Sequence, residues 1–259
     1  MSTTEVLYSS DGPVAFLTFN RPEARNAMTW TMYDALVEAC DRVDADPAIR
    51  AFVLRANGDA FVAGTDIRQF AEFASGDDGI AYERRIDTVI ERLERVTVPT
   101  IAQVQGVAAG GGCVIACVCD LRVCTPHATF GVPVARTLGN CLSAANYARL
   151  VDLIGPARTR DLVFTGRLMA AHEALAAGLV TRLVEPQAID GAVRDLVSAL
   201  VSNAPLTIRA TKTALGRLAQ RRRAEVDADD LIAACYASHD FREGVAAFLA
   251  KRPPVFTGK

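Results

Sequence analysis

The stretch that decides the fold reads Gln105-Gly106-Val107-Ala108-Ala109-Gly110-Gly111-Gly112-Cys113-Val114-Ile115-Ala116-Cys117-Val118-Cys119-Asp120. An apolar, strand-like segment at 100–104 runs into it, and a small-residue apolar segment runs out of it. Three consecutive glycines at a strand-to-helix junction allow another group to approach the main chain closely, and they leave free N–H groups at a helix N-terminus. Such N–H groups attract negative charge, and the helix dipole adds to the attraction. The stretch therefore predicts a site for an anion, or for an oxygen that becomes one.

Length and composition indicate a globular protein. The chain has 259 residues, of which 51% are hydrophobic and 22% charged, enough for one large domain or for a domain with an appendage. The formal net charge of −2 gives no basic surplus for binding nucleic acid. No apolar run approaches the roughly 18 residues that span a bilayer, so we expect no membrane partner. The N-terminus lacks a basic and an apolar signal region, which favours a cytoplasmic location.

Four of the seven cysteines cluster, at positions 113, 117, 119 and 124. A cluster of this kind is either a metal site or a set of small buried hydrophobic side chains in a reducing compartment. Zinc sites prefer Cys-x2–4-Cys pairs accompanied by a second pair or by histidines. The spacings here do not match that pattern, so we predict buried thiols and no metal site.

Hydrophobic patterning predicts an α/β chain with parallel strands, followed by a helical C-terminal region. Thr29, Asp66 and Ser143 each precede a helical pattern and are candidate N-caps, although Ser143 is also a candidate nucleophile. Residues 75–79 and 129–140 read as loops. The predicted strands are 6–8, 14–19, 51–56, 100–104, 121–124 and 179–183, and the predicted helices before residue 142 are 29–43, one from residue 67, 80–96 and one after the glycines.

Two turns share one design. Residues 62–66 and 109–112 each follow a strand and open a helix, so side by side they would aim two backbone N–H groups at one oxygen. That arrangement is an oxyanion hole, which stabilises an enolate or a tetrahedral intermediate. The alternative is that both turns serve packing alone. The glycine spacing fits neither the dinucleotide fingerprint nor a P-loop, no G-x-S-x-G elbow is present, and the three histidines (His127, His172 and His239) show no catalytic partner spacing.

Motifs spread over nearly the whole chain resemble those of the crotonase superfamily, the enoyl-CoA hydratase/isomerase family. They occur in the family's order, and together they are specific. The matching residues are Asn20-Arg21-Pro22, Asn26-Ala27, Phe61-x-Ala63-Gly64-Thr65-Asp66-Ile67, Gln105-Gly106-x3-Gly110-Gly111-Gly112-Cys113, Cys119-Asp120, Ala128-Thr129-Phe130-Gly131-x-Pro133, Ala174-x3-Gly178-Leu179-Val180 and the C-terminal run from Asp240 to Phe256.

The resemblance implies a ββα superhelix (core 1–200) with a C-terminal helical trimerisation region (201–259), assembled as a homotrimer or a dimer of trimers. It implies an acyl-CoA thioester substrate whose oxygen lies between the N–H groups of Thr65 and Gly111, with coenzyme A as part of the substrate and no separate cofactor. The positions that match coenzyme A contacts in the family are Arg25, Ala27, Ala63, Gly64, Asp66, Ile67, Phe248 and Lys251.

The resemblance also shows where the pattern breaks. Enoyl-CoA hydratases carry two glutamates, and the matching positions here are Val114 and Val134. A positioned acid or base contributes roughly 10²- to 10⁴-fold in rate, so efficient hydration is not expected from this chain. The oxyanion hole is main chain and survives such replacements.

Arg136 and Asn140 follow Val134, where other superfamily members place divergent catalytic groups. Arg136 is a candidate clamp for a substrate carboxylate or a surface charge, and Asn140 is a candidate for orienting water or a carbonyl, or a turn residue. The leading hypothesis is an acyl-CoA enzyme that works through an enolate. The rivals are a malonyl-type acyl-CoA decarboxylase and a non-catalytic acyl-CoA-binding protein.

Overall fold

The computed structural model describes residues 4–223 and 226–259 and contains two sheets. The larger has the order β1-β2-β3-β4-β6-β9, in which β1 is antiparallel to β2 and the other neighbours are parallel. The smaller has the order β5-β7-β8, with β5 parallel to β7 and β8 antiparallel to it. The strands are β1 Val6–Asp11, β2 Val14–Phe19, β3 Ala51–Ala56, β4 Thr100–Val104, β5 Val107–Ala109, β6 Leu121–Cys124, β7 Thr129–Gly131, β8 Met169–Ala170 and β9 Arg182–Leu183.

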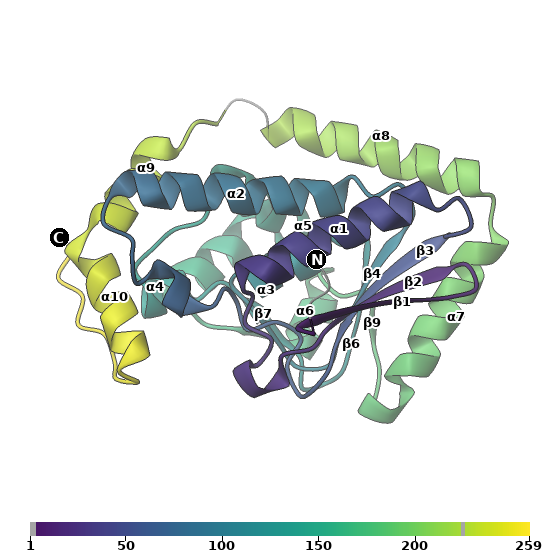
Figure 1. The fold of residues 1–259 in the computed structure, drawn as a ribbon, viewed down its shortest axis with the longest axis horizontal. Coiled ribbons are helices and arrows are strands. Elements are labelled where there is room, and N and C mark those ends of the chain that lie inside the picture. The colour runs from purple at the N-terminus through teal and green to yellow at the C-terminus, as the bar shows by residue number, and fades with distance from the viewer. Residues whose placement is uncertain (1–3, 224–225) are drawn as a thin grey trace.

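Helices cover both faces of the larger sheet (Figure 1). The α-helices are α1 Trp30–Ala45, α2 Gly76–Glu94, α3 Gly111–Val118, α4 Val134–Thr137, α5 Ala144–Thr165, α6 Ala171–Ala176, α7 Ile189–Ser202, α8 Pro205–Arg223, α9 Asp229–Ala237 and α10 His239–Leu249. Three short 3-10 helices are η1 Pro22–Ala24, η2 Ile67–Phe70 and η3 Pro186–Ala188.

Alternating side chains of the larger sheet enter two separate cores, because successive residues of a strand point to opposite faces. Leu54 joins the large core formed with α1, α2 and α3, whereas its neighbour Val53 joins a smaller core beneath α7. The apolar run at 51–56 therefore has both faces covered, as is usual for parallel strands.

Most of the expected elements are confirmed. Thr29, Asp66 and Ser143 each accept a hydrogen bond from the backbone of the following helix, so all three act as N-caps. The glycine run opens α3 as expected, with Gly110 at its N-cap.

Two predicted loops are wrong. Residues 129–140 contain β7 and α4, because pairing with β5 and β8 extends an apolar segment that lacks a strand pattern of its own. Residues 75–79 contain the start of α2, where Ser75 and Asp78 form a capping box. The predicted strand 179–183 shortens to β9, and β8 was not predicted because a two-residue strand leaves no periodicity.

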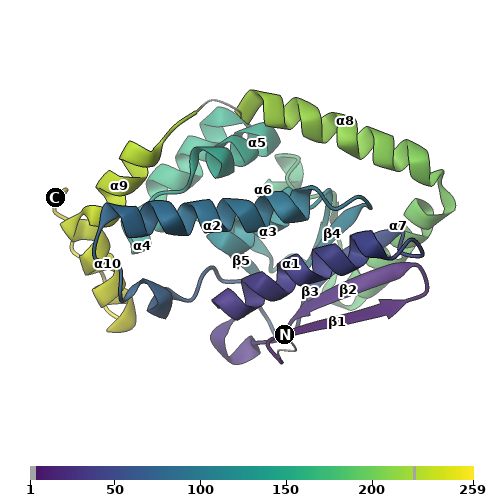
Figure 2. The ribbon, with the colours of Figure 1, turned by 45° about the horizontal axis from the view of Figure 1, so that its top comes forward.

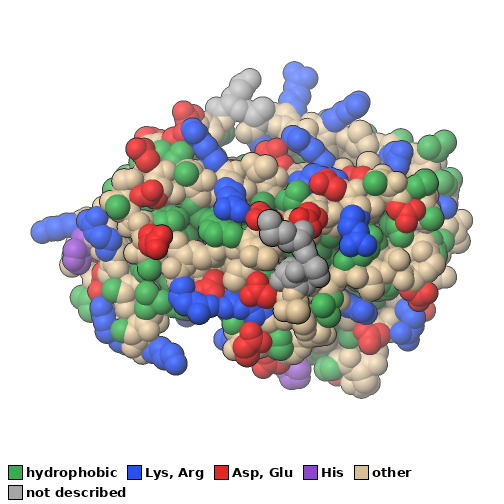
Figure 3. Space-filling view, in the orientation of Figure 1, with side chains coloured by type: hydrophobic (Ala, Val, Ile, Leu, Met, Phe, Trp, Pro, Cys, Tyr) green, Lys and Arg blue, Asp and Glu red, His purple; other side chains and the backbone are tan. Residues whose placement is uncertain are grey.

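The C-terminal helices leave the sheet and return to the other end of the molecule. Figures 1 and 2 show α8 running over the top of α5 and α1, and α9 and α10 lying against the end of α2. In the space-filling view, Lys and Arg side chains stand along the edge that α8 occupies (Figure 3), and three arginines end that helix. The division at residue 200 stays a prediction.

The four clustered cysteines, 113, 117, 119 and 124, are buried in the large core as small hydrophobic side chains. The sulfurs of Cys113 and Cys117 lie 3.9 Å apart on one face of α3. In the described part of the chain, no helix combines the length and apolarity that crossing a membrane requires.

Close packing at Gly112 generates a first prediction. A Cβ atom added there would lie 2.1 Å from the backbone oxygen of Val62, so Gly112→Ala must displace one turn from the other. We expect a loss of about 2–3 kcal/mol in the free energy of unfolding, measured by urea denaturation. The control is Gly216→Ala in α8, where a Cβ meets nothing within 4 Å and alanine should stabilise by about 0.5–1 kcal/mol. Equal stability of the two variants would contradict this packing.

Candidate active site

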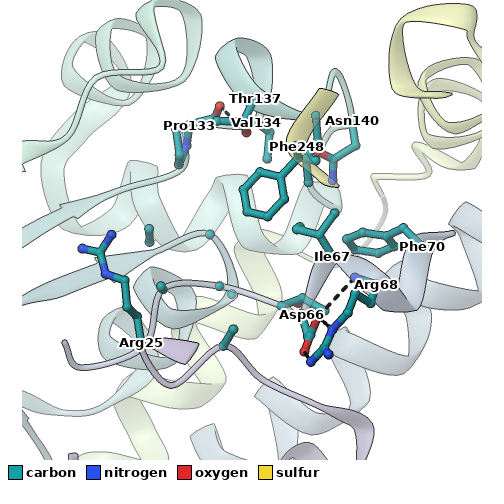
Figure 4. A pocket seen from close by; sticks show the side chains of 18 of the residues that line it. Arg25, Asp66, Ile67, Arg68, Phe70, Pro133, Val134, Thr137, Asn140 and Phe248 are labelled. Atoms are coloured by element: carbon teal, nitrogen blue, oxygen red, sulfur yellow. Dashed lines mark hydrogen bonds and ion pairs between the residues drawn. The ribbon is translucent and has the colours of Figure 1, made fainter. Parts of the chain in front are cut away.

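A cavity of about 680 Å³ opens between the two glycine-bearing turns, α2, α4 and the C-terminal α10. Of the predicted site residues, Thr65, Gly111, Val114, Val134 and Asn140 line it. So do all the positions proposed to contact coenzyme A: Arg25, Ala27, Ala63, Gly64, Asp66, Ile67, Phe248 and Lys251. Residues more than 200 positions apart in the sequence therefore meet around one hollow (Figure 4).

Backbone hydrogen bonds hold the two turns together. The N–H of Val62 donates to the Val107 oxygen at 3.1 Å, and the N–H of Ala109 donates back to the Val62 oxygen at 3.0 Å. A Cβ on Gly110 would lie 3.7 Å from the Gly64 Cα, so the turns are in contact beyond these bonds. Gly64 and Gly110 have φ values of 116° and 53°, which favour glycine.

The backbone N–H groups of Thr65 and Gly111 belong to these turns. Within residues 4–223 and 226–259, neither donates a hydrogen bond to another protein group. Both residues line the cavity. Because backbone N–H groups seldom lack an acceptor, the arrangement suits an oxygen atom supplied from the cavity.

Two buried tyrosines fix the Thr65 side chain. Its hydroxyl is 2.8 Å from the Tyr33 hydroxyl on α1 and 2.7 Å from the Tyr82 hydroxyl on α2. Burial raises the pKa of both tyrosines well above 10, so both hydroxyl groups stay neutral. The side-chain hydroxyl of Thr65 therefore has two protein partners, whereas its backbone N–H has none among the described residues.

Charged residues gather at the mouth of the cavity. Asp66 accepts hydrogen bonds from Arg21 and Arg68, and these guanidinium groups, Arg68 foremost, lower the pKa of its carboxyl to about 2. Figure 4 shows the Asp66–Arg68 pair apart from the exposed Arg25. Lys251 is exposed as well, so both cations can meet the phosphates of a ligand.

The candidate residues that follow the second glycine turn differ in whether they face the cavity. Val114 and Val134 are both buried in the wall of the cavity, where they offer no proton carrier. Arg136 does not line the cavity: it is exposed on α4 and faces Gly166, because α4 turns Val134 inward and Arg136 outward. Asn140 lines the cavity, and its Nδ2 donates to the Tyr236 hydroxyl at 3.0 Å.

Glu83 is the site residue that the sequence analysis missed. It lies on α2, lines the cavity and is only 2% exposed. Its Oε1 accepts from the Tyr236 hydroxyl at 2.7 Å and its Oε2 from the Ser143 N–H at 3.0 Å. Burial raises the pKa of Glu83 to about 7, against the lowering effect of these two donors.

A sequence signal for Glu83 exists. The buried residues of α2 include Gly79, Ile86, Ile90 and Leu93, at helical spacing. Glu83 lies in the same stripe, so its carboxyl interrupts an otherwise apolar face. A charged residue in the apolar stripe of a helix is the pattern that predicts a buried ionisable group.

Comparisons with known proteins agree with one another. A family model described as enoyl-CoA hydratase/isomerase matches residues 10–259. The chain is 32% identical over 258 residues to the short-chain-enoyl-CoA hydratase of Clostridium acetobutylicum, with 97% of each chain covered. It resembles the crystal structure of an enoyl-CoA hydratase/carnithine racemase from Magnetospirillum magneticum, with a TM-score of 0.81, 32% identity, and 100% of this chain and 97% of that one covered. It resembles a methylmalonyl-CoA decarboxylase in complex with 2-nitronate-propionyl-CoA, with a TM-score of 0.90, 26% identity and full coverage of both chains. The expected crotonase-type fold is thereby confirmed.

The raised pKa of Glu83 generates a pH prediction. An ordinary glutamate has a pKa near 4.5, so between about pH 4.5 and 7 the folded protein binds more protons at this position than the unfolded chain. The free energy of unfolding therefore falls as the pH rises from about 4.5 to about 7, by about 3 kcal/mol in total, and the loss is complete above the folded-state pKa. Glu83→Gln mimics the neutral acid and should lack this fall.

The measurement is urea unfolding of both proteins at pH 5 and pH 8, at one protein concentration. The half-buried Asp87 also has a raised pKa, and its charge contributes to the raised pKa of Glu83; because Asp87 is present in both proteins, the difference between them reports the carboxyl at position 83 together with that interaction. Glu91→Gln, on the same helix and outside the cavity lining, is the matched control and should follow the wild type. A Glu83→Gln curve parallel to the wild-type curve would contradict the prediction.

Proposed function

Since the chain belongs to the enoyl-CoA hydratase/isomerase family, we propose that it processes an acyl-CoA thioester through an enolate held by the backbone N–H groups of Thr65 and Gly111. The observation that carries the proposal is the contact between the two turns, with both N–H groups unpaired at one cavity among the described residues. Loss of a proton beside the thioester carbonyl moves negative charge to the carbonyl oxygen. Two preorganised N–H donors stabilise that charge more than they stabilise the neutral carbonyl.

The coenzyme A portion is proposed to lie at the charged mouth of the cavity. Arg25 and Lys251 would meet its phosphates, and Phe248 and Ile67 would cover its apolar parts. Of the remaining proposed contacts, Ala63 and Gly64 would act through their backbone. Ala27 and Asp66 would shape the wall, since the carboxylate and the backbone of Asp66 are already paired. Coenzyme A is then part of the substrate, and no separate cofactor is proposed.

The reaction type follows from what lines the interior. With Val114 and Val134 at the positions that match the two family glutamates, addition of water lacks its usual pair of carboxyl groups. Proton transfer between two carbons of the acyl group requires only one acid–base residue. We therefore favour double-bond isomerisation over efficient hydration.

Decarboxylation of a malonyl-type thioester is the second candidate. The similarity to a methylmalonyl-CoA decarboxylase favours it. The sequence favoured decarboxylation because Arg136 was a candidate to bind the substrate carboxylate. The Arg136 side chain lies outside the cavity lining, so it does not provide that contact. Release of CO2 from malonyl-type thioesters would establish this activity.

A matched pair of variants tests the oxyanion hole. Gly111→Pro removes the N–H, and proline is tolerated at the first position of a helix. Gly111→Ala keeps the N–H and places the same Cβ 2.7 Å from the Tyr33 hydroxyl. We expect Gly111→Pro to slow deuterium exchange at the α-carbon of a bound acyl-CoA by about 10²- to 10³-fold relative to Gly111→Ala.

The measurement is mass spectrometry of acyl-CoA recovered from D2O. Equal rates for the two variants would remove the Gly111 N–H from the mechanism. Tight binding of acyl-CoA with no exchange by the wild type would instead favour a non-catalytic binding protein.

We also propose that the chain forms a homotrimer or a dimer of trimers. Leu215 and Leu218, three residues apart on α8, are 61% and 60% exposed, so they present neighbouring apolar side chains that another copy of the chain could cover. Light scattering should give a mass of three or six copies of the 27.7 kDa chain, and Leu215→Glu with Leu218→Glu should shift it downward. A wild-type mass of one copy would contradict the assembly. The cytoplasmic location stays a prediction.

A further inference from the structure

Among the residues that the structure describes, three carboxyl groups line the cavity, and one of these is suited to move a proton inside it. The side chain of Glu23 is 73% exposed at the mouth. Asp66 is held as a carboxylate by Arg21 and Arg68, which lower its pKa to about 2. Glu83 is buried, and within the described residues no cation forms an ion pair with it. Its carboxyl therefore has no structural ion-pair partner to explain why it is buried.

Helix α2 places Glu83 beside the proposed oxyanion turn. Tyr82 reaches across to the Thr65 hydroxyl, and the next residue, Glu83, reaches the N–H of Ser143. Ser143 ends the segment that begins with Val134 and carries Asn140 along the cavity wall. The carboxyl thus lies on the wall between the Thr65 turn and the segment after Val134.

The hydrogen bonds around Glu83 accommodate both protonation states. In the ionised state Asn140 donates to Tyr236, and Tyr236 donates to Oε1 of Glu83. The Oδ1 atom of Asn140 is then buried with no partner. If Glu83 gains a proton on Oε1, that proton can bond to the Tyr236 oxygen, and the tyrosine proton can turn to the Asn140 Oδ1 once the amide rotates by 180°.

Room for a substrate proton remains on the carboxylate. Two carboxylate oxygens offer about four lone-pair positions, and the protein donors occupy two. Because Glu83 lines the cavity, a free position is available to an acyl chain bound there.

We propose that Glu83 is the acid–base residue that moves a proton on the acyl group, and that Tyr236 and Asn140 are its positioning residues. The inference rests on the proposed enolate function. The Glu83 carboxylate takes a proton from the α-carbon of a β,γ-unsaturated thioester, the C–H electron pair enters the conjugated system, and the thioester oxygen gains the charge. The resulting acid returns the proton to the γ-carbon, which gives the α,β-unsaturated thioester. No water, oxidant or reductant is consumed.

The test measures two rates. The first is the conversion of but-3-enoyl-CoA to but-2-enoyl-CoA, followed by the absorbance of the conjugated product. The second is deuterium exchange at the α-carbon in D2O. Glu83→Gln should lower both rates by about 10²- to 10⁴-fold while thioester binding is retained. Glu91→Gln, the same substitution on the same helix outside the cavity lining, should keep the wild-type rates.

A second variant keeps the test decisive if Glu83→Gln folds poorly. The Tyr236 hydroxyl lowers the pKa of Glu83, so Tyr236→Phe should raise the pKa of Glu83. The isomerisation rate increases with pH as Glu83 ionises, and this increase should therefore occur at higher pH in Tyr236→Phe. Cys235 is a free thiol whose pKa is lowered to about 7 by a hydrogen bond with the Cys141 thiol, so it titrates in the same range, and Cys235→Ser should leave the pH dependence of the rate unchanged. In the described part of the chain, the other titratable groups that interact with Glu83 are Asp87, Tyr33, Tyr82, Cys141 and Tyr147.

The outcomes separate the two proposals. Wild-type rates in Glu83→Gln, with Gly111→Pro still impaired, would overturn the role of Glu83 and leave the oxyanion hole standing. A pH dependence of the rate that shifts in Cys235→Ser and not in Tyr236→Phe would also overturn the role of Glu83. Absence of any exchange or isomerisation by the wild type would overturn both proposals.

Discussion

The pairing of residues 61–62 with residues 107–109 is the constraint on which the site depends. Phe61 and Val62 both donate to the Val107 oxygen at 3.1 Å, and Ala109 returns a bond to Val62. These bonds set the two turns at a fixed separation before any side chain is considered. Glycines at positions 106 and 112 are required nearby, since a Cβ at either would lie about 2 Å from a backbone oxygen of the facing segment. The site is thus built from main chain, and the surrounding side chains are free to differ.

Helix α2 links this backbone arrangement to the interior of the cavity. Tyr82 and Glu83 are adjacent, yet they bond to segments that lie on either side of the cavity, residue 65 and residue 143. Burying a carboxyl group without a cation is unfavourable, and the raised pKa of Glu83 expresses that cost. A structural role alone would be served by an uncharged side chain. A buried carboxyl at this position, without a cation among the described residues, therefore points to chemistry rather than to packing.

The distribution of charge along the cavity matches a long substrate with a charged end. Arginine and lysine side chains lie at the mouth, and Val114, Val134 and Leu142 lie in the wall farther along. Electrostatic interactions weaken in water and strengthen in a dry interior, so the mouth suits recognition and the interior suits proton transfer. The segment 134–143 connects the two regions, since Val134 lies at its start and Glu83 accepts a hydrogen bond from Ser143 at its end.

The sequence by itself determined the local structure and the position of the two turns. The caps at Thr29, Asp66 and Ser143, the strand patterns and the glycine run all act over a few residues, and their physical effects can be read from neighbours in the chain. The motif order also identified the family, and the residues it assigned to the coenzyme A site all line one cavity.

Only the tertiary structure decided what faces the cavity. Val134 and Arg136 are two residues apart, and the short helix α4 turns one inward and the other outward. Glu83 sits among charged residues in the sequence, and its burial depends on Tyr236, which lies 153 positions away. Local patterns report which side chains prefer water, whereas the environment of an ionisable group is set by distant segments that close over it. That is why the two glycine-bearing turns could be located from the sequence, whereas for Glu83 the sequence offered only a carboxyl in the apolar stripe of a helix and not the groups that surround it.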